Sequence, residues 1–262
     1  MTKYIFSVFF LGFLLLGKQH LVAQNKNLEI SEALAANSEK LKVKMGAQWF
    51  GKIWKFKFGD YAVTDSKNKY GPTTSNSNFF NTKVETKSNQ KFSFVLRDKT
   101  TETAIVEVAF SIQTKELLAI ELFSNFYLGP NLLLKDSQNF TAFISTSDNA
   151  TDTWVLVLKM DQGSEIENKQ EAFLTNGERL ISIIPISSND SGRDSRMFPA
   201  LGYEFTENDQ PLGAMQYYGG GALGFNKNIV WLPTHLEPRM KLILAAAMTS
   251  LLQKHADEMA ID

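Results

Sequence analysis

Hydrophobic and polar residues alternate along much of the chain from Lys40 onward. Lys40–Met45 has a lysine at every second position, and Lys52–Phe58 alternates again, with Trp54, Phe56 and Phe58 on one face. Strict alternation is typical of a half-buried antiparallel strand, because successive side chains point to opposite faces of a sheet. We therefore expect both segments to be strands.

Strand-like segments then recur at roughly hairpin spacing. They lie at Lys91–Arg97, Ala104–Gln113, Leu117–Ser124, Phe140–Ser145, Thr153–Lys159, Arg179–Ile186, Tyr203–Thr206, Leu212–Tyr218 and Asn228–Leu232. About a dozen strands at this spacing predict a mainly β protein, an antiparallel barrel or a barrel-like sandwich. The stretch Thr64–Asn81 is rich in Ser, Thr and Asn around Gly71-Pro72, and it is expected to be a surface loop.

The end of the chain has a different pattern. Residues Pro238–Asp257 have a helix-forming composition, and proline suits the first turn of a helix. No charged residue lies between Lys241 and Lys254, and the interior Leu242–Leu252 is apolar on nearly every face. A surface helix has a polar face. We therefore expect the helix 238–257 to be enclosed by the sheet, with its alanines allowing strands to approach closely.

This order of elements resembles the tubby C-terminal-like architecture, which includes tubby, the phospholipid scramblases and the plant LURP-one-related proteins. The resemblance rests on Leu201–Thr206, the turn Asn208-Asp209, Leu212–Tyr217, Asn228–Leu232 and the helical Met240–Leu252. It implies a barrel closed around a hydrophobic C-terminal helix and covers only the last part of the chain. No residue matches the family's phosphoinositide-binding positions, so none is carried over. The alternative architecture is a sandwich with the helix packed on one face.

The first residues resemble a secretory signal peptide. Lys3 is followed by the apolar run Ile5–Leu16 and by a small residue, Ala23, at the expected cleavage point. The run is shorter than the roughly 20 residues of a membrane-spanning helix, although an uncleaved anchor is the alternative. We expect residues 1–23 to be removed, with 24–40 a lead containing a short helix near Leu28–Ala36, and 41–262 a single β-rich domain. The expected location is a bacterial periplasm or the cell exterior.

Composition excludes several classes of protein. The chain has 27 basic and 28 acidic residues, and loss of Lys3 and Lys18 would leave 25 against 28, a net charge of −3. A nucleic-acid-binding domain is normally strongly basic, so nucleic acid is not an expected partner. With 44% hydrophobic and 21% charged residues the chain is not disordered as a whole. It contains no cysteine, which excludes disulfides and thiolate metal sites.

The sequence contains no nucleophile elbow, zinc-binding helix or serine-acylase motif, and no cofactor is expected. His235 and His255 lie at opposite ends of the expected helix. Near the C-terminus of this helix, the helix dipole would favour His255 as a cation. The glycines of Gly219–Gly224 precede another strand instead of a helix, so a dinucleotide site is not expected. Asn189–Asp194 lacks the spacing of a calcium loop and is interpreted as a polar connection.

The most distinctive polar feature is basic. Six lysines are the only charged residues between positions 40 and 59. If the two alternating segments pair, one face carries Lys42, Lys44, Lys55 and Lys57, which we interpret as a candidate binding surface for an anionic lipid or an acidic glycan. Lysines can instead protect a strand edge from edge-to-edge association. The expected function is non-enzymatic binding of a lipid, glycan or protein. The alternatives are an exported hydrolase acting on glycan or lipid with an unrecognised carboxylate site, and a structural component of the cell envelope.

Overall fold

The computed structural model describes residues 27–79, 82–100, 102–110, 121–123, 126–127, 138–160, 172–189, 199–220 and 226–259. The expected signal peptide, residues 1–23, lies outside them, as do most of Asn189–Asp194 and all of Gly219–Gly224 after Gly220.

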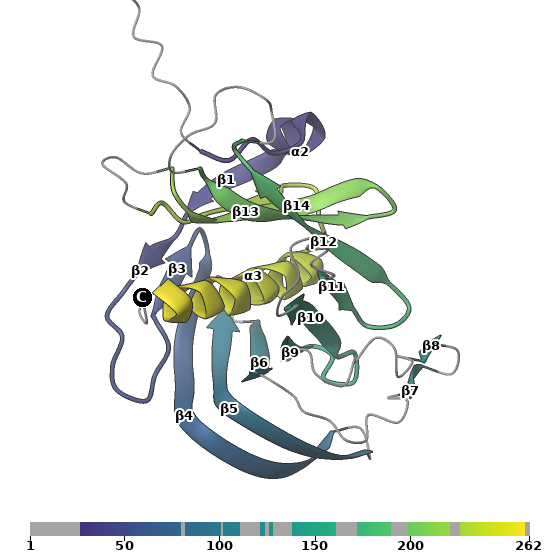
Figure 1. Cartoon of the computed structure of the whole chain (residues 1–262). Helices are drawn as coiled ribbons and strands as arrows, with labels where there is room; N and C mark the ends of the chain where they lie inside the picture. The colour runs from purple at the N-terminus through teal and green to yellow at the C-terminus, as the bar shows by residue number, and fades with distance from the viewer. Residues whose placement is uncertain are drawn as a thin grey trace, which may run out of the picture.

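In the part of the chain that the structure describes, thirteen strands form one antiparallel sheet that curls into a nearly closed barrel (Figure 1). Its strands, in chain order, are β1 (Ser38–Lys42), β2 (Lys44–Met45), β3 (Phe56–Phe58), β4 (Tyr61–Phe79), β5 (Thr82–Arg97), β6 (Thr103–Phe110), β9 (Gln138–Thr146), β10 (Trp154–Met160), β11 (Ala172–Thr175), β12 (Leu180–Ser187), β13 (Leu201–Glu207), β14 (Gln210–Tyr218) and β15 (Ile229–Pro233). The short strands β7 (Glu121–Phe123) and β8 (Phe126–Tyr127) form a separate pair. The expected mainly β barrel is confirmed.

One continuous segment brings the two edges of the sheet together. The edge strands β1 and β2 are separated in sequence by Val43 alone. Strand β1 pairs with β15, whereas β2 pairs with β3 on the opposite edge. The Val43 amide donates to the carbonyl oxygen of Asn228 at 3.0 Å, so the chain stays attached to one edge as it reaches the other.

The helix α3 (Pro238–Met259) lies inside the barrel, as expected (Figure 1). Every residue from Leu242 to Lys254 is buried, so no face of this stretch is exposed to solvent. The helix contacts β6 and β9 on one side and β14 on another. Close approach to β14 occurs at Gly213, where an added Cβ would lie 2.9 Å from Cε of Met248. The absence of charge across the helix is thus explained by its complete enclosure.

Part of the N-terminal lead covers the outside of the barrel. The short helix α2 (Glu32–Asn37) begins later than the expected Leu28–Ala36, because Leu28 is held in an extended segment by its amide hydrogen bond to the buried Gln216 side chain. Leu28 and Leu34 pack in a small outer cluster with Trp231. Residues preceding the barrel therefore protect apolar side chains on its outer face.

Two sequence interpretations are corrected by the strand boundaries. Thr64–Asn81 is not a surface loop, since its described residues belong to β4 and pair with β5 along nearly their whole length. Pro72, which cannot donate a hydrogen bond, falls at a register shift between Tyr70 and Thr73. The strand expected at Lys52–Phe58 contains only Phe56–Phe58. Strand β11 was not expected from the sequence.

Candidate functional site

The four lysines singled out by sequence lie on two neighbouring parts of the barrel seam. Lys44 is directly opposite Lys57 in the β2–β3 ladder, and the carbonyl of Lys55 accepts the Gly46 amide at 2.9 Å just beyond it. Lys42 lies on β1, opposite Ile229 of β15, and not on the β2–β3 pair. We call Lys42, Lys44, Lys55 and Lys57 the lysine seam.

All four side chains of the lysine seam are exposed. Leu41 and Val43 are buried on either side of Lys42, and Phe56 and Phe58 are buried on either side of Lys57. The alternation therefore directs Lys42 and Lys57 to the outside of the barrel, as expected. The assumption that Lys42 belongs to the same strand pair as Lys57 is wrong, because the chain changes sheet edge at Val43.

No lysine of the lysine seam forms an ion pair within the described part of the chain. The ion pairs found there do not include any of its four members. Like charges directly opposite in a ladder, such as Lys44 and Lys57, are destabilising. Two further lysines, Lys40 and Lys227, lie near each other beside the seam. Partial burial lowers the pKa of Lys40, and the positive charge of Lys227 lowers it further. The pairing of Lys44 with Lys57 therefore places two positive charges together at a cost in stability.

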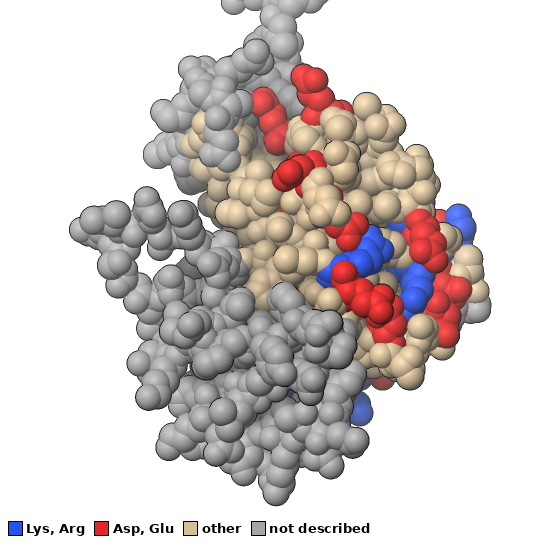
Figure 2. All heavy atoms as spheres, turned by 90° about the vertical axis from the view of Figure 1, so that its right-hand side faces the viewer, with Lys and Arg blue, Asp and Glu red and all other residues tan. Residues whose placement is uncertain are grey.

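Acidic side chains dominate a different side of the molecule. Figure 2 shows the face that lies at the right of Figure 1, and Asp and Glu are prominent over its described part, with fewer Lys and Arg among them. Strands β2 and β3 of the lysine seam lie at the left of Figure 1. The described part of the face in Figure 2 therefore carries more acidic than basic side chains, unlike the lysine seam.

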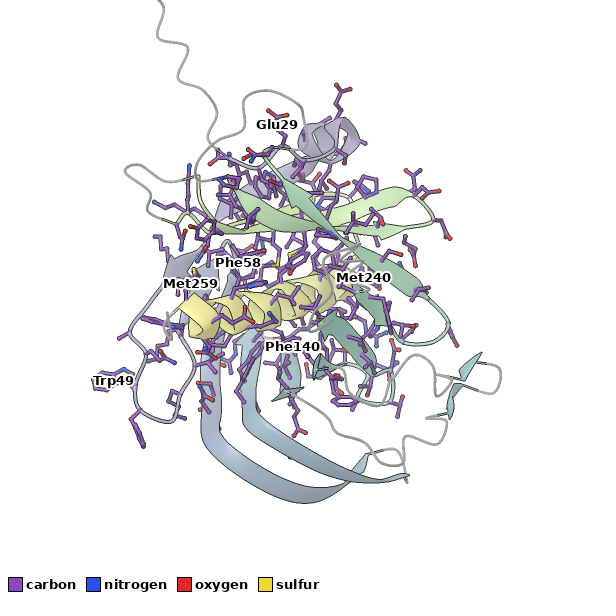
Figure 3. The ribbon with its side chains drawn as sticks, viewed as in Figure 1. Glu29, Trp49, Phe58, Phe140, Met240 and Met259 are labelled. Atoms are coloured by element: carbon purple, nitrogen blue, oxygen red, sulfur yellow. The ribbon has the colours of Figure 1, made fainter. Side chains whose placement is uncertain are left out.

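A hydrogen-bonded loop connects β2 to β3 beside the lysine seam. The Lys52 amide donates to the carbonyl oxygen of Trp49 at 3.0 Å, closing a turn in which Gly51 has a φ of +71°. A positive φ at the third position of a turn favours glycine. Trp49 and Phe50 consequently lie at the tip, and Trp49 points away from the barrel (Figure 3). Trp49 is 66% exposed and Phe50 is fully exposed.

The same loop is anchored at its base. The carbonyl oxygen of Gly51 accepts the amide of Asn68, and the Ile53 amide donates to the Ser66 hydroxyl. The Trp54 amide donates to the Gln253 side chain, and Trp54 packs against the barrel core. These partners occur in place of a neighbouring strand, which explains why β3 is shorter than expected. Trp49 and Phe50 were not predicted to be functional residues, although two adjacent aromatics between Gly46 and Gly51 were a detectable signal.

A buried polar cluster surrounds the C-terminal end of α3. The His255 ring stacks on Tyr217 with centroids 3.7 Å apart. Its Nδ1 lies 3.0 Å from a Glu258 carboxylate oxygen, and its Nε2 lies 3.2 Å from the Tyr203 hydroxyl. A neutral imidazole protonated on Nδ1 satisfies both contacts, donating to the carboxylate and accepting from the phenol. Lys254 is 2% exposed and reaches the other carboxylate oxygen at 2.6 Å.

Burial and hydrogen bonding together determine the protonation of this cluster. Burial lowers the pKa of His255, with help from the nearby Lys254 charge, so His255 is not the cation that its position near the helix C-terminus predicted. Burial alone would raise the pKa of Glu258, but hydrogen bonds from His255 and Lys254 outweigh it and lower the pKa to about 2. Burial also raises the pKa of Tyr217. The cluster thus combines a neutral imidazole and protonated phenols with one carboxylate whose charge Lys254 balances.

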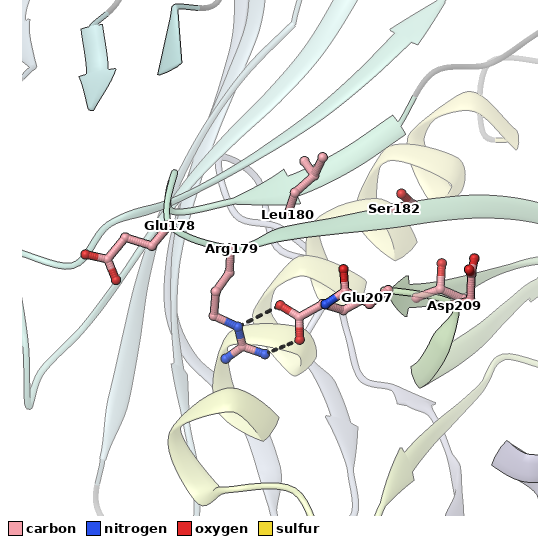
Figure 4. Close-up of a pocket in the computed structure, with 8 residues that line it drawn as sticks. Glu178, Arg179, Leu180, Ser182, Glu207 and Asp209 are labelled. Carbon is pink, nitrogen blue, oxygen red and sulfur yellow. Dashed lines mark hydrogen bonds and ion pairs between the residues drawn. The ribbon is translucent and has the colours of Figure 1, made fainter. Parts of the chain in front are cut away.

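A half-open pocket of about 490 Å³ lies beside the turns that join β11 to β12 and β13 to β14 (Figure 4). Its lining comprises Glu178, Arg179, Leu180, Ser182, Thr206, Glu207, Asn208 and Asp209. Arg179 donates to both carboxylate oxygens of Glu207, from Nε at 2.7 Å and Nη2 at 2.6 Å. That hydrogen bonding lowers the pKa of Glu207. The Arg179 guanidinium in this pocket is therefore already bound by the Glu207 carboxylate. The expected turn Asn208-Asp209, which also lines the pocket, is confirmed by positive φ values at both residues.

The two histidines do not come together as a site. His235 is exposed in the turn before α3, and about 30 Å of helix separates it from His255. Among the described residues, no cluster of three or more His, Cys, Asp or Glu side chains has the proximity that a metal ion requires. In the described ranges, no helix combines the length and hydrophobicity required to cross a bilayer.

The chain has no match among protein-family models, curated proteins or solved structures.

Proposed function

We propose that the protein is a non-enzymatic binding protein whose lysine seam recognises an anionic surface. The observation that carries the proposal is the exposure of four lysines side by side on the barrel seam without an acidic partner among the described residues. Phospholipid headgroups and acidic glycans share the chemistry that such a surface recognises, which is a dense array of negative charges.

The magnitude of the attraction is sufficient for reversible binding. Each lysine close to an anionic bilayer contributes about 1 kcal/mol, so four together provide about 4 kcal/mol. This attraction decays over a Debye length of about 8 Å at physiological ionic strength. Binding is therefore expected to weaken as salt is added, and the acidic side in Figure 2 would orient the barrel with the lysine seam toward the negative surface.

Reversing the four charges tests the proposal. Lys42, Lys44, Lys55 and Lys57→Glu together are expected to weaken co-sedimentation with phosphatidylglycerol vesicles, or retention on an acidic polysaccharide, by about a thousandfold or more. For a control with the same change in charge, Lys57→Glu is compared with Lys241→Glu in the first turn of α3. Equal losses in both single variants, or no binding by the parent chain, would remove the lysine seam as a binding surface.

Edge protection is the competing role for these lysines. Strands β1 and β2 are the edges of the sheet, and each has a side without a strand partner in the described structure. Under that role the quadruple Glu variant would still discourage strand pairing, because its side chains remain charged, and the variant would bind as the parent does. The vesicle measurement therefore separates the two roles.

Export belongs to the same proposal. Removal of residues 1–23 would place the lysine seam in the periplasm or outside the cell, where it would meet envelope lipids or glycans. The expected result is a mature chain that begins at Gln24, measured by the intact mass of the protein recovered from the periplasm or medium of an expressing bacterium. A cytoplasmic chain that retains Met1 would contradict export and leave the binding surface unaffected.

The tubby-like likeness also stays a proposal. It is supported by the enclosed α3 and the hairpin formed by β13 and β14, which lie in the order that the resemblance requires. A hydrolase remains the alternative function. Turnover in a screen of glycan and lipid substrates with the purified chain would favour it.

A further inference from the structure

The tip of the β2–β3 loop presents two large aromatic side chains to solvent. Trp49 is 66% exposed and Phe50 is fully exposed, although Ile53 and Trp54 of the same loop are buried or packed against the core. Exposed apolar side chains scattered singly are normal, whereas adjacent ones beside a functional surface indicate an interaction site. The fold buries one aromatic of this loop and holds two others outside.

We propose that Trp49 and Phe50 insert into the headgroup–acyl boundary of an anionic lipid bilayer while the lysine seam contacts the phosphates. This inference rests on the proposed function and specifies its ligand. Tryptophan is enriched at membrane–water interfaces because its ring is apolar and its N–H is polar. Phe50 has no polar atom and gains only from an apolar layer, which the bilayer provides directly beneath its charged headgroups.

Loop geometry favours insertion. Hydrogen bonds from the Asn68 amide to Gly51 and from the Ile53 amide to Ser66 hold the tip against β4. A preformed tip loses less conformational freedom on binding than a flexible one. The tip is also close to electrically neutral, because Lys52 pairs with Asp65 at 3.0 Å. Charge is thus concentrated in the neighbouring lysine seam, and the part that would enter the membrane carries none in excess.

Other partners fit these observations less well. An acidic polysaccharide offers negative charge but no apolar layer for Phe50. A protein partner normally covers about 800 Å² on each side, and the exposed large hydrophobic residues at this end of the described structure are few. They are Met45, Trp49, Phe50 and Met259. Two exposed aromatic side chains beside a positive surface are the combination that suits binding to an anionic membrane.

Tryptophan fluorescence distinguishes insertion from surface attraction. The full mature chain is mixed with vesicles of phosphatidylglycerol and phosphatidylcholine, some carrying brominated acyl chains that quench only an inserted indole. We expect a blue shift and quenching. Trp49→Phe should keep the binding but lose the quenching, since Trp154 and Trp231 are buried and Trp54 packs on the core. Trp49→Ala and Phe50→Ala should each weaken vesicle binding by about tenfold or more.

A surface control is Ile184→Ala on β12, which removes an exposed apolar residue from a strand remote from β3 in the sheet order and should leave vesicle binding unchanged. Vesicle binding that depends on the lysine seam, but shows neither quenching nor a loss in the two alanine variants, would overturn insertion and leave the proposed function standing. Binding to an acidic polysaccharide alone would do the same. Self-association that Trp49→Ala abolishes, without vesicle binding, would assign the tip to a second copy of the chain. Absence of all binding would overturn both proposals.

Discussion

Leu244→Asp and Ala246→Arg are each expected to abolish folding. Both side chains are 0% exposed on α3, with strands on opposite sides of the helix. Either variant would bury an unpaired charge, which costs several kcal/mol even after relaxation. Leu244→Asp also loses about 2–5 kcal/mol of packing, and Ala246→Arg has no space for its side chain. These losses are comparable to the whole stability of a domain, about 5–15 kcal/mol.

The measurement is the yield of soluble protein and its thermal transition by circular dichroism. Ile105→Asp and Ile105→Arg are matched controls, because they introduce the same groups at a site that is 52% exposed on the barrel exterior. The controls should melt cooperatively within a few degrees of the parent. A soluble Ala246→Arg protein with a cooperative transition would contradict the enclosure of α3.

Glu258→Gln is expected to destabilise the protein by about 2 kcal/mol. The substitution keeps the shape of the side chain but leaves the buried Lys254 ammonium without its counter-charge. Breaking a fully buried ion pair costs roughly 3–5 kcal/mol. The smaller value is expected here because the Glu258 side chain is 40% exposed, so that water offsets part of the loss.

A double-mutant cycle isolates this interaction. Lys254→Met replaces the buried ammonium by an apolar side chain and should be nearly neutral. In that background Glu258→Gln should cost much less than in the parent, measured by urea unfolding. Equal costs in the two backgrounds would show that Lys254 and Glu258 are not coupled.

The same cluster should make the protein sensitive to acid. The folded-state pKa of His255 and that of Glu258 are both lowered, so the unfolded chain binds more protons. Stability therefore rises with pH through these groups. On acidification, the His255 contribution is lost as the pH falls below about 6.5, and the Glu258 contribution is lost from about 4.5 toward 2. His255→Phe keeps an aromatic ring stacked on Tyr217. This variant should make the melting temperature less dependent on pH between pH 7 and 5.

Local patterns were sufficient for many of the strands and for the central helix. The buried positions of β1 and β3 follow from alternation. Leu41 alternates with exposed lysines in β1, and Phe56 and Phe58 lie two residues apart in β3. The helix was recognisable because no position from Leu242 to Leu252 carries charge, which only full burial explains. The turn at Asn208-Asp209 was recognisable because these residue types tolerate a positive φ.

The candidate site was only partly accessible to the same reasoning. Exposure of the lysine seam follows from alternation, but its division between two edges depends on the exchange of partners at Val43. Lys91–Arg97 of β5 was expected as a strand, but the part of β4 from Thr64 onward was missed because its composition indicated a loop, whereas strand pairing satisfies the backbone whatever the side chains. Trp54 continues the alternation of Phe56 and Phe58, which predicts that it packs on the core, but no local feature shows that Trp49 stays exposed.

By itself the amino-acid sequence determined that the chain is a β protein with an enclosed terminal helix and a dense run of exposed lysines. These properties depend on hydrophobicity and spacing, which are local. Only the tertiary structure decided that β1 and β2 meet at the seam, that His255 is neutral beside Tyr217, and that Phe50 remains in solvent. The reason is that edge pairing, burial of a charge and exposure of a loop depend on which distant segments fill the space around them.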